Sequence, residues 1–166
     1  MSLSTANKRA VVTGATKGLG LAIAHQLAQA GYDVFIGGRN KEELEATAAS
    51  LDSLYPATKA SFAPADLSKK EAVFSFAQAI LAGGSTVDVL VNNAGIYLPG
   101  EVSTEEEGRL EKLIETNLYS AYHLTRQLLP AIQQSQGGHI FNMCSIASLA
   151  AYPGGGSYSI SKFALL

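Results

Sequence analysis

The sequence has few of the features that mark secreted, membrane or nucleic-acid-binding proteins. Its only cysteine is Cys144, so no disulfide can form within the chain. No segment approaches the ~18 uninterrupted apolar residues of a membrane span, and the polar start at residues 2–9 lacks the apolar core of a signal peptide. Lysine and arginine form no cluster, and the net charge is −2. We therefore expect a cytoplasmic protein with neither a membrane nor a nucleic acid as its partner.

The chain does contain enough apolar material for one compact domain. Of its 166 residues, 47% are apolar and only 16% are charged. A globular chain of this length buries roughly 70% of the surface that it exposes when unfolded. We expect a single domain over residues 1–166, with a sizeable hydrophobic core.

Strand-like and helix-like patterns alternate along the chain. Strands are expected at residues 9–13, 33–38, 59–64, 87–91 and 139–143. Helices are expected at residues 18–30, 41–54, 68–81 and 105–129, and from about residue 157 onward. This alternation predicts βαβ units and an α/β fold, a doubly wound parallel sheet with strand order 3-2-1-4-5.

Local signals mark some of the expected helix ends. Ser68 precedes Glu71 by three residues, and Thr104 precedes Glu107 by three; both pairs are typical of a capping box at a helix start. Pro130 should end or kink the helix expected at 105–129.

Each expected strand is followed by a distinctive glycine or polar cluster. These clusters are residues 14–20, Arg39, Asp66, residues 92–95 and Ser145. In doubly wound folds, ligands bind at the carboxyl ends of the strands, near the point where the strand order reverses. The coincidence predicts a ligand site at this edge of the sheet.

The segment TGATKGLG, residues 13–20, lies between the first strand and its helix. Gly14 allows a tight turn, Gly18 lets backbone N–H groups approach a pyrophosphate, and Gly20 allows close contact of helix and sheet. In a chain with 16 glycines this spacing could also be an unrelated turn. The strand before it and the helix after it favour a dinucleotide site.

The end of the second strand indicates which dinucleotide. An NAD site places an acid there for the ribose 2′-hydroxyl, whereas this chain has Arg39, together with Lys17 in the glycine turn. Each cation alone could be an ordinary solvated side chain. Together they favour the 2′-phosphate of NADP(H) over NAD(H). The pair Gly37–Gly38 before Arg39 is expected to make this strand end flexible.

Tyr158 and Lys162 are four residues apart and would share one face of a helix. A neighbouring cation lowers the pKa of a phenol and makes tyrosine a usable acid or base. Ser145, directly after the fifth strand, could donate to a substrate carbonyl oxygen. Tyr55 and Lys59 have the same spacing, but Pro56 opposes a helix there.

Other catalytic chemistries have little support. No Gly-x-Ser-x-Gly turn surrounds Ser145, and the three histidines fall within expected helices or at a strand start. Cys144 is expected to be a small buried residue rather than a nucleophile.

With these residues in view, the sequence resembles the short-chain dehydrogenases/reductases, specifically their NADP-preferring branch. The resemblance covers essentially the whole chain. It rests on residues 13–20, Ala65-Asp66-Leu67, the NNAG segment at 92–95, Thr116-Asn117, and Ser145 followed by Tyr158 and Lys162.

The resemblance implies a role for each matching residue. Ser145 would orient the carbonyl, Tyr158 would be the acid/base, Lys162 would lower its pKa and hold the nicotinamide ribose, and Asn117 would hold a relay water through its backbone. The implied cofactor-binding residues are Gly14, Ala15, Thr16, Lys17, Gly18, Leu19, Gly20, Arg39, Asp66, Leu67, Asn93, Gly95, Tyr158 and Lys162. No metal is implied.

The expected activity is hydride transfer between NADP(H) and a carbonyl or secondary alcohol, such as a 3-oxoacyl thioester, a pterin-like carbonyl or another ketone. The alternatives are a non-catalytic dinucleotide-binding module and an inactive fragment. Family members continue past this point with further strands, so we expect a C-terminally truncated domain that exposes a hydrophobic edge after its fifth strand. The family also implies a homodimer or homotetramer.

Overall fold

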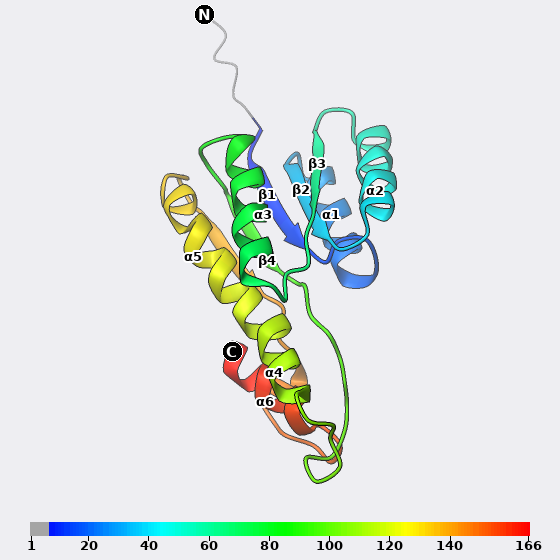
Figure 1. Cartoon of the computed structure of the whole chain (residues 1–166). Helices are drawn as coiled ribbons and strands as arrows, with labels where there is room; N and C mark the ends of the chain where they lie inside the picture. Colours follow the sequence, from blue (N-terminus) through cyan, green and yellow to red (C-terminus); the bar gives the residue numbers. More distant parts are fainter. Residues whose placement is uncertain (1–6) are drawn as a thin grey trace, which may run out of the picture.

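The structure, a computed structural model, describes residues 7–166. The expectations for the polar start, and for the first residues of the domain, therefore lie partly outside the described residues. Five parallel strands form one sheet in the order β3-β2-β1-β4-β5, as expected (Figure 1). The strands are β1 (Arg9–Thr13), β2 (Asp33–Gly38), β3 (Ala60–Pro64), β4 (Val89–Asn92) and β5 (His139–Asn142).

Helices cover the sheet on both faces. Neighbouring residues of the central strand point in opposite directions, so they join two separate hydrophobic clusters. Val11 joins a cluster with Leu90 and residues of α3 (Lys70–Ala82) and α5 (Ser120–Gln133). Ala10 and Val12 join a second cluster with residues of α1 (Gly18–Gln29) and α2 (Lys41–Leu54). β1 is consequently a nearly continuous run of buried residues, as is usual in parallel sheets.

Two of the expected helix caps are wrong. α3 begins at Lys70 without a side-chain cap, and the Ser68 hydroxyl donates to the Asp66 carboxylate at 2.9 Å. The Thr104 hydroxyl donates to the carbonyl of Glu101, and no helix starts there. In both cases a neighbour outside the helix satisfies the hydroxyl.

The helix expected at 105–129 is three consecutive pieces. α4 (Arg109–Ile114) is followed by a π-helical turn (Glu115–Tyr119) and then by α5. Pro130 lies inside α5, which continues to Gln133, so the proline does not end the helix. The alternative expectation, a kink, stays a prediction.

The last elements lie beyond the carboxyl edge of the sheet. A 3-10 helix (Ile146–Ser148) follows β5, and α6 (Gly156–Leu165) packs against it and against α4. In Figure 1, α4 and α6 extend below the strands on the side toward which β1 points. All four residues of β5 are exposed, Phe141 to 53%, which agrees with the expected hydrophobic edge. Among the described residues, no helix has the length and apolar character that crossing a membrane requires.

Candidate active site

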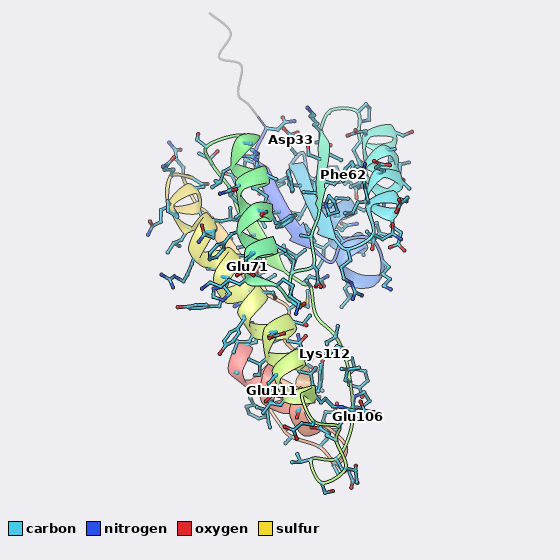
Figure 2. The ribbon with its side chains drawn as sticks, viewed as in Figure 1. Asp33, Phe62, Glu71, Glu106, Glu111 and Lys112 are labelled. Carbon is cyan, nitrogen blue, oxygen red and sulfur yellow. The ribbon has the colours of Figure 1, made fainter. Side chains whose placement is uncertain are left out.

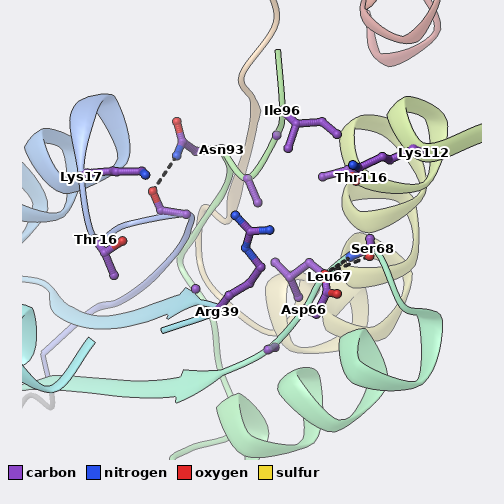
Figure 3. A pocket seen from close by; sticks show the side chains of 15 residues that line it. Thr16, Lys17, Arg39, Asp66, Leu67, Ser68, Asn93, Ile96, Lys112 and Thr116 are labelled. Atoms are coloured by element: carbon purple, nitrogen blue, oxygen red, sulfur yellow. Dashed lines mark hydrogen bonds between the residues drawn. The ribbon is translucent and has the colours of Figure 1, made fainter. Parts of the chain in front are cut away.

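A pocket of about 400 Å³ opens at the carboxyl edge of the sheet (Figure 3). Its walls come from the ends of β1 to β4 and from α4 and the π-helical turn. The lining residues are Gly14, Thr16, Lys17, Gly38, Arg39, Ala65, Asp66, Leu67, Ser68, Asn93, Ala94, Gly95, Ile96, Lys112 and Thr116.

The glycine turn is held against the neighbouring strand ends. The amide of Gly14 donates to the carbonyl of Gly37 at 2.8 Å, and the Asn93 side chain donates to the carbonyls of Thr13 and Gly14. A Cβ atom at Gly20 would overlap the carbonyl oxygen of Gly14 and the Asn93 amide. The start of α1 can therefore approach the sheet closely only with glycine at position 20.

Cationic side chains surround the pocket. Lys17 reaches in from the α1 side and Arg39 from the end of β2, and Figure 3 shows Lys112 on the opposite wall. Partial burial works to raise the pKa of Asp66, but hydrogen bonds from Ser68 and the charge of Arg39 outweigh it. The net effect holds the pKa of this carboxyl below its usual value.

The structure places the residues of the glycine motif in two groups. Gly14, Thr16 and Lys17 line the pocket, together with Arg39, Asp66, Leu67, Asn93 and Gly95. Ala15 is buried below the turn, and Leu19 is 65% exposed. The cavity lining includes none of Ala15, Gly18, Leu19 and Gly20. Tyr158 and Lys162 also lie outside its lining.

Several lining residues escaped the sequence reasoning. Lys112 and Thr116 come from the helical segment beyond β4, and Ile96 directly follows the NNAG segment. Thr116 belongs to the Thr116-Asn117 motif but was not predicted as a binding residue, and Ile96 directly follows the NNAG motif. Lys112 had no such signal, because its place opposite Arg39 depends on where α4 lies beyond the carboxyl edge of the sheet.

Asn117 lies within the π-helical turn and is 1% exposed. Its Oδ1 accepts from the amide of Ile96 at 2.8 Å, and its Nδ2 donates to the carbonyl of Ile96 at 3.1 Å and to the Ser161 hydroxyl at 3.0 Å. The side chain thus joins the segment after β4 to α6. π-Helical turns are frequent at functional sites.

Lys162 is buried, and its ammonium donates to the carbonyl of Met143 at 2.7 Å. Burial lowers the pKa of this ammonium, and the neighbouring Cys144 acts in the opposite direction. A Cβ atom at Gly95 would lie 3.7 Å from Lys162 Nζ and 3.1 Å from Asn117 Oδ1. Gly95 also lines the pocket, so Asn117 and Lys162 lie close to this residue of the pocket wall.

Ser145 ends the segment after β5 and caps the 3-10 helix. Its Oγ accepts from the amide of Ala147 at 3.2 Å, and its own amide donates to Ser148 Oγ at 3.2 Å. Among the described residues its hydroxyl donates no hydrogen bond, so the proton is available to an external acceptor. Cys144 beside it is half-buried, less covered than expected.

Tyr158 belongs to an aromatic group at the start of α6. Its ring meets the ring of Tyr97 edge-on, with 4.8 Å between centroids. A hydrogen bond with Tyr97 raises the pKa of Tyr152 to about 12. The similarly spaced Tyr55 caps the end of α2, and the amide of Lys59 donates to Asp33, so that pair shares no helix.

A doubly wound parallel sheet with a glycine turn and a cationic pocket at its carboxyl edge defines a nucleotide-binding Rossmann-type fold. The family model for short chain dehydrogenases matches residues 8–166. The chain belongs to this family of oxidoreductases, which act on alcohol and ketone groups with a nicotinamide cofactor.

Individual relatives are similar over nearly the whole chain. It is 36% identical over 166 residues to a 3-oxoacyl-[acyl-carrier-protein] reductase of Chlamydia trachomatis, covering 100% of this chain and 66% of that protein. It is 32% identical over 162 residues to a gluconate 5-dehydrogenase of Gluconobacter oxydans, covering 98% and 62%. The chain thus spans just under two thirds of the length of these curated relatives.

Solved structures show the same architecture. A metagenomic short-chain oxidoreductase in complex with NADP aligns with a TM-score of 0.87 at 36% identity, covering 95% of this chain and 71% of that one. An L-sorbose reductase from Gluconobacter frateurii, in complex with NADPH and L-sorbose, aligns with a TM-score of 0.91 at 27% identity, covering 99% and 62%.

Proposed function

We propose that the protein transfers hydride between NADP(H) and a carbonyl or secondary alcohol, with Tyr158 as the acid/base. The observation that carries the proposal is the joint presence of Lys17 and Arg39 in one pocket, whose lining residue Gly95 lies close to the buried Lys162. The NADP and NADPH in the two related structures support the choice of cofactor.

The residues of the pocket fit a phosphorylated dinucleotide. Arg39 can bind a 2′-phosphate through its planar fork of donors, and Lys17 adds a second positive charge. Lys112 faces them across the cavity (Figure 3) and adds a third. Gly95 leaves a narrow space beside Asn117 and Lys162, which a Cβ atom would fill.

When bound, the nicotinamide supplies or accepts the hydride. In the reductive direction, the Tyr158 phenol gives its proton to the carbonyl oxygen, and the free proton of Ser145 forms a hydrogen bond to the same oxygen. The Lys162 ammonium donates one of its three protons to the carbonyl of Met143, and the other two remain available for the ribose and the phenol. Asn117 would hold a relay water through its backbone.

The chemistry is tested by following NADPH oxidation with 3-oxoacyl thioesters, pterin-like carbonyls and simple ketones. The Tyr158→Phe variant should lose turnover and keep its cofactor affinity, because the phenol oxygen is removed and the pocket is left intact. Tyr55→Phe, the tyrosine with the same spacing to a lysine, serves as the matched control. Turnover by Tyr158→Phe equal to that of Tyr55→Phe would refute the mechanism.

The cofactor preference is tested by titrating the protein with NADPH and NADH. Arg39→Ala should weaken NADPH binding by about tenfold or more, since a charge-assisted hydrogen bond contributes ~1.5–3 kcal/mol. NADH binding should change little. Arg126→Ala, an exposed arginine on α5, is the control. Equal effects of Arg39→Ala on both cofactors would contradict the assignment.

The main alternative is a dinucleotide-binding module without catalysis. Tight NADPH binding combined with no turnover on any carbonyl would favour it. We also propose a cytoplasmic location and a homodimer or homotetramer. The exposed Tyr119 of the π-helical turn and Tyr122 of α5 support an oligomer, since aromatic residues are enriched at interfaces. Light scattering of the purified protein measures the assembly directly.

A further inference from the structure

The first turn of α6 is held by a side chain from another part of the chain. The helix begins at Gly156 with no side-chain cap of its own, because its N-cap residue is Gly155. The Glu105 carboxylate fills this role: its Oε1 accepts from the amide of Ser157 at 2.9 Å, and its Oε2 accepts from the Ser157 hydroxyl. Ser157 is the residue directly before Tyr158.

We propose that Glu105 is a positioning residue that fixes Tyr158 through the start of α6. The inference rests on the proposed function, in which Tyr158 is the acid/base. The amides of a first helical turn have no partner within the helix. A carboxylate at this end satisfies one of them and interacts favourably with the helix dipole.

The surrounding loops are shaped to this contact. The amide of Gly100 donates to the carbonyl of Gly154 at 2.9 Å, which ties the loop after β4 to the loop before α6. Gly156 has a φ of +40°, and a Cβ atom there would overlap both Glu105 Oε1 and the carbonyl oxygen of Gly100. Glu105 can therefore reach the helix start only because position 156 is a glycine.

The segment that carries Glu105 is itself ordered by local hydrogen bonds. The amide of Glu105 donates to the carbonyl of Glu101 at 3.1 Å, and Arg109 Nη1 donates to the carbonyl of Pro99 at 3.0 Å. The hydrogen bonds from Ser157 lower the pKa of Glu105, and the charge of Arg109 acts in the same direction. The carboxylate is therefore the form that caps the helix near neutral pH.

The two turns of α6 have different supports. Asn117 and the carbonyl of Met143 hold Ser161 and Lys162 in the second turn. Glu105 holds the first turn, where Tyr158 lies. Loss of Glu105 should therefore displace the phenol relative to Ser145 and leave Lys162 in place. Since Lys17 and Arg39 lie on other elements, the affinity for the cofactor should not change.

The test compares Glu105→Ala, Glu105→Gln and Glu106→Ala in the full chain. Glu106 is the exposed neighbour near the tip of the same loop (Figure 2) and serves as the matched control. Glu105→Ala should lower kcat by about 10- to 100-fold with Kd for NADPH unchanged, because a misplacement of ~1 Å can cost about 100-fold. Glu105→Gln keeps an acceptor for the amide and a donor for the hydroxyl, so kcat should fall only about twofold to fivefold.

Amide hydrogen exchange gives a readout that does not depend on turnover. In Glu105→Ala the amides of residues 157–159 should exchange faster than in Glu106→Ala, while those of α1 should not. If Glu105→Ala fails to fold, Ser157→Ala tests the same contact by removing one of its two hydrogen bonds, and kcat should then fall partway.

Three results would overturn the inference: equal kcat in Glu105→Ala and Glu106→Ala, unchanged exchange at residue 157, or a glutamine variant no better than the alanine variant. An unchanged kcat in Ser157→Ala would do the same. If the unmodified protein turns over no carbonyl substrate, the proposed function fails instead, and the exchange measurement still decides whether Glu105 holds the helix.

Discussion

Replacing Asn117 by alanine should destabilise the protein far more than replacing an exposed asparagine. The side chain is 1% exposed and makes three hydrogen bonds, two with the backbone of Ile96 and one with Ser161. Each such bond contributes ~0.5–1.5 kcal/mol net, and a buried donor left without a partner costs ~1–3 kcal/mol. We expect a loss of about 2–4 kcal/mol in the free energy of unfolding.

The matched control is Asn40→Ala. Asn40 is exposed and caps α2: its Oδ1 accepts from the amide of Glu43 at 3.1 Å, and its Nδ2 donates to Glu43 Oε1 at 3.4 Å. Its loss should cost ~1 kcal/mol. Urea unfolding followed by circular dichroism measures both variants, and an unchanged slope with denaturant would show that only stability has changed. For a protein of this size, Tm should fall by about 5–15 °C in Asn117→Ala.

A second variant separates hydrogen bonding from lost volume. Asn117→Leu fills the space and still leaves the backbone of Ile96 without partners, so it should be about as unstable as Asn117→Ala. The reasoning is refuted if Asn117→Ala costs no more than Asn40→Ala. It is also refuted if leucine restores the stability that alanine loses.

Two further predictions concern packing and pH. Gly37→Ala places a Cβ atom in overlap with the buried ring of Phe76, which should lower the free energy of unfolding by ~1–3 kcal/mol. The loss should be smaller in a Phe76→Leu background. An equal loss in both backgrounds would show that the ring is not the obstacle. Burial and the charges of Lys70 and Arg126 lower the pKa of His123 in the folded protein. At pH values just below the ordinary pKa of ~6.5, the unfolded chain therefore binds more protons than the folded protein. The free energy of unfolding should therefore fall as the pH drops through that window. In a plot of the urea midpoint against pH, His123→Gln should reduce the slope in this range. An unchanged slope would show that other groups cause the pH dependence.

The sheet could be predicted because each strand has its own pattern of apolar residues in the local sequence. Residues 9–13 and 33–38 were predicted with the bounds that the structure has, and the strand order followed from the βαβ alternation. The helix starts at Ser68 and Thr104 were mispredicted; in the structure their hydroxyls donate to Asp66 and to the carbonyl of Glu101. Such a competing partner is common for serine and threonine, and a capping pattern alone does not reveal it.

The pair Gly37–Gly38 shows a second limit of sequence reasoning. Two adjacent glycines predicted a flexible approach to Arg39, but both are paired with β3, and the amide of Ala65 donates to the carbonyl of Gly38 at 2.7 Å. Gly37 is required by the ring of Phe76, which comes from α3 and lies against it. The flexibility of this strand end stays a prediction, whereas the contact with Phe76 could not be read from the local sequence because Phe76 is distant in the chain.

The candidate site is assembled in the same way, by polar contacts between distant segments. Asn117 bonds to Ile96 and Ser161, Lys162 bonds to Met143, and Glu105 bonds to Ser157. Each contact satisfies a backbone or buried polar group that would otherwise lose its hydrogen bond to water, so these residues cannot change independently. The motifs identify Asn117 and Lys162 by their chemistry, whereas Glu105 belongs to a charged stretch that reads as ordinary surface. A positioning residue of this kind can be identified only from the folded structure, because its function depends on the partner that it holds.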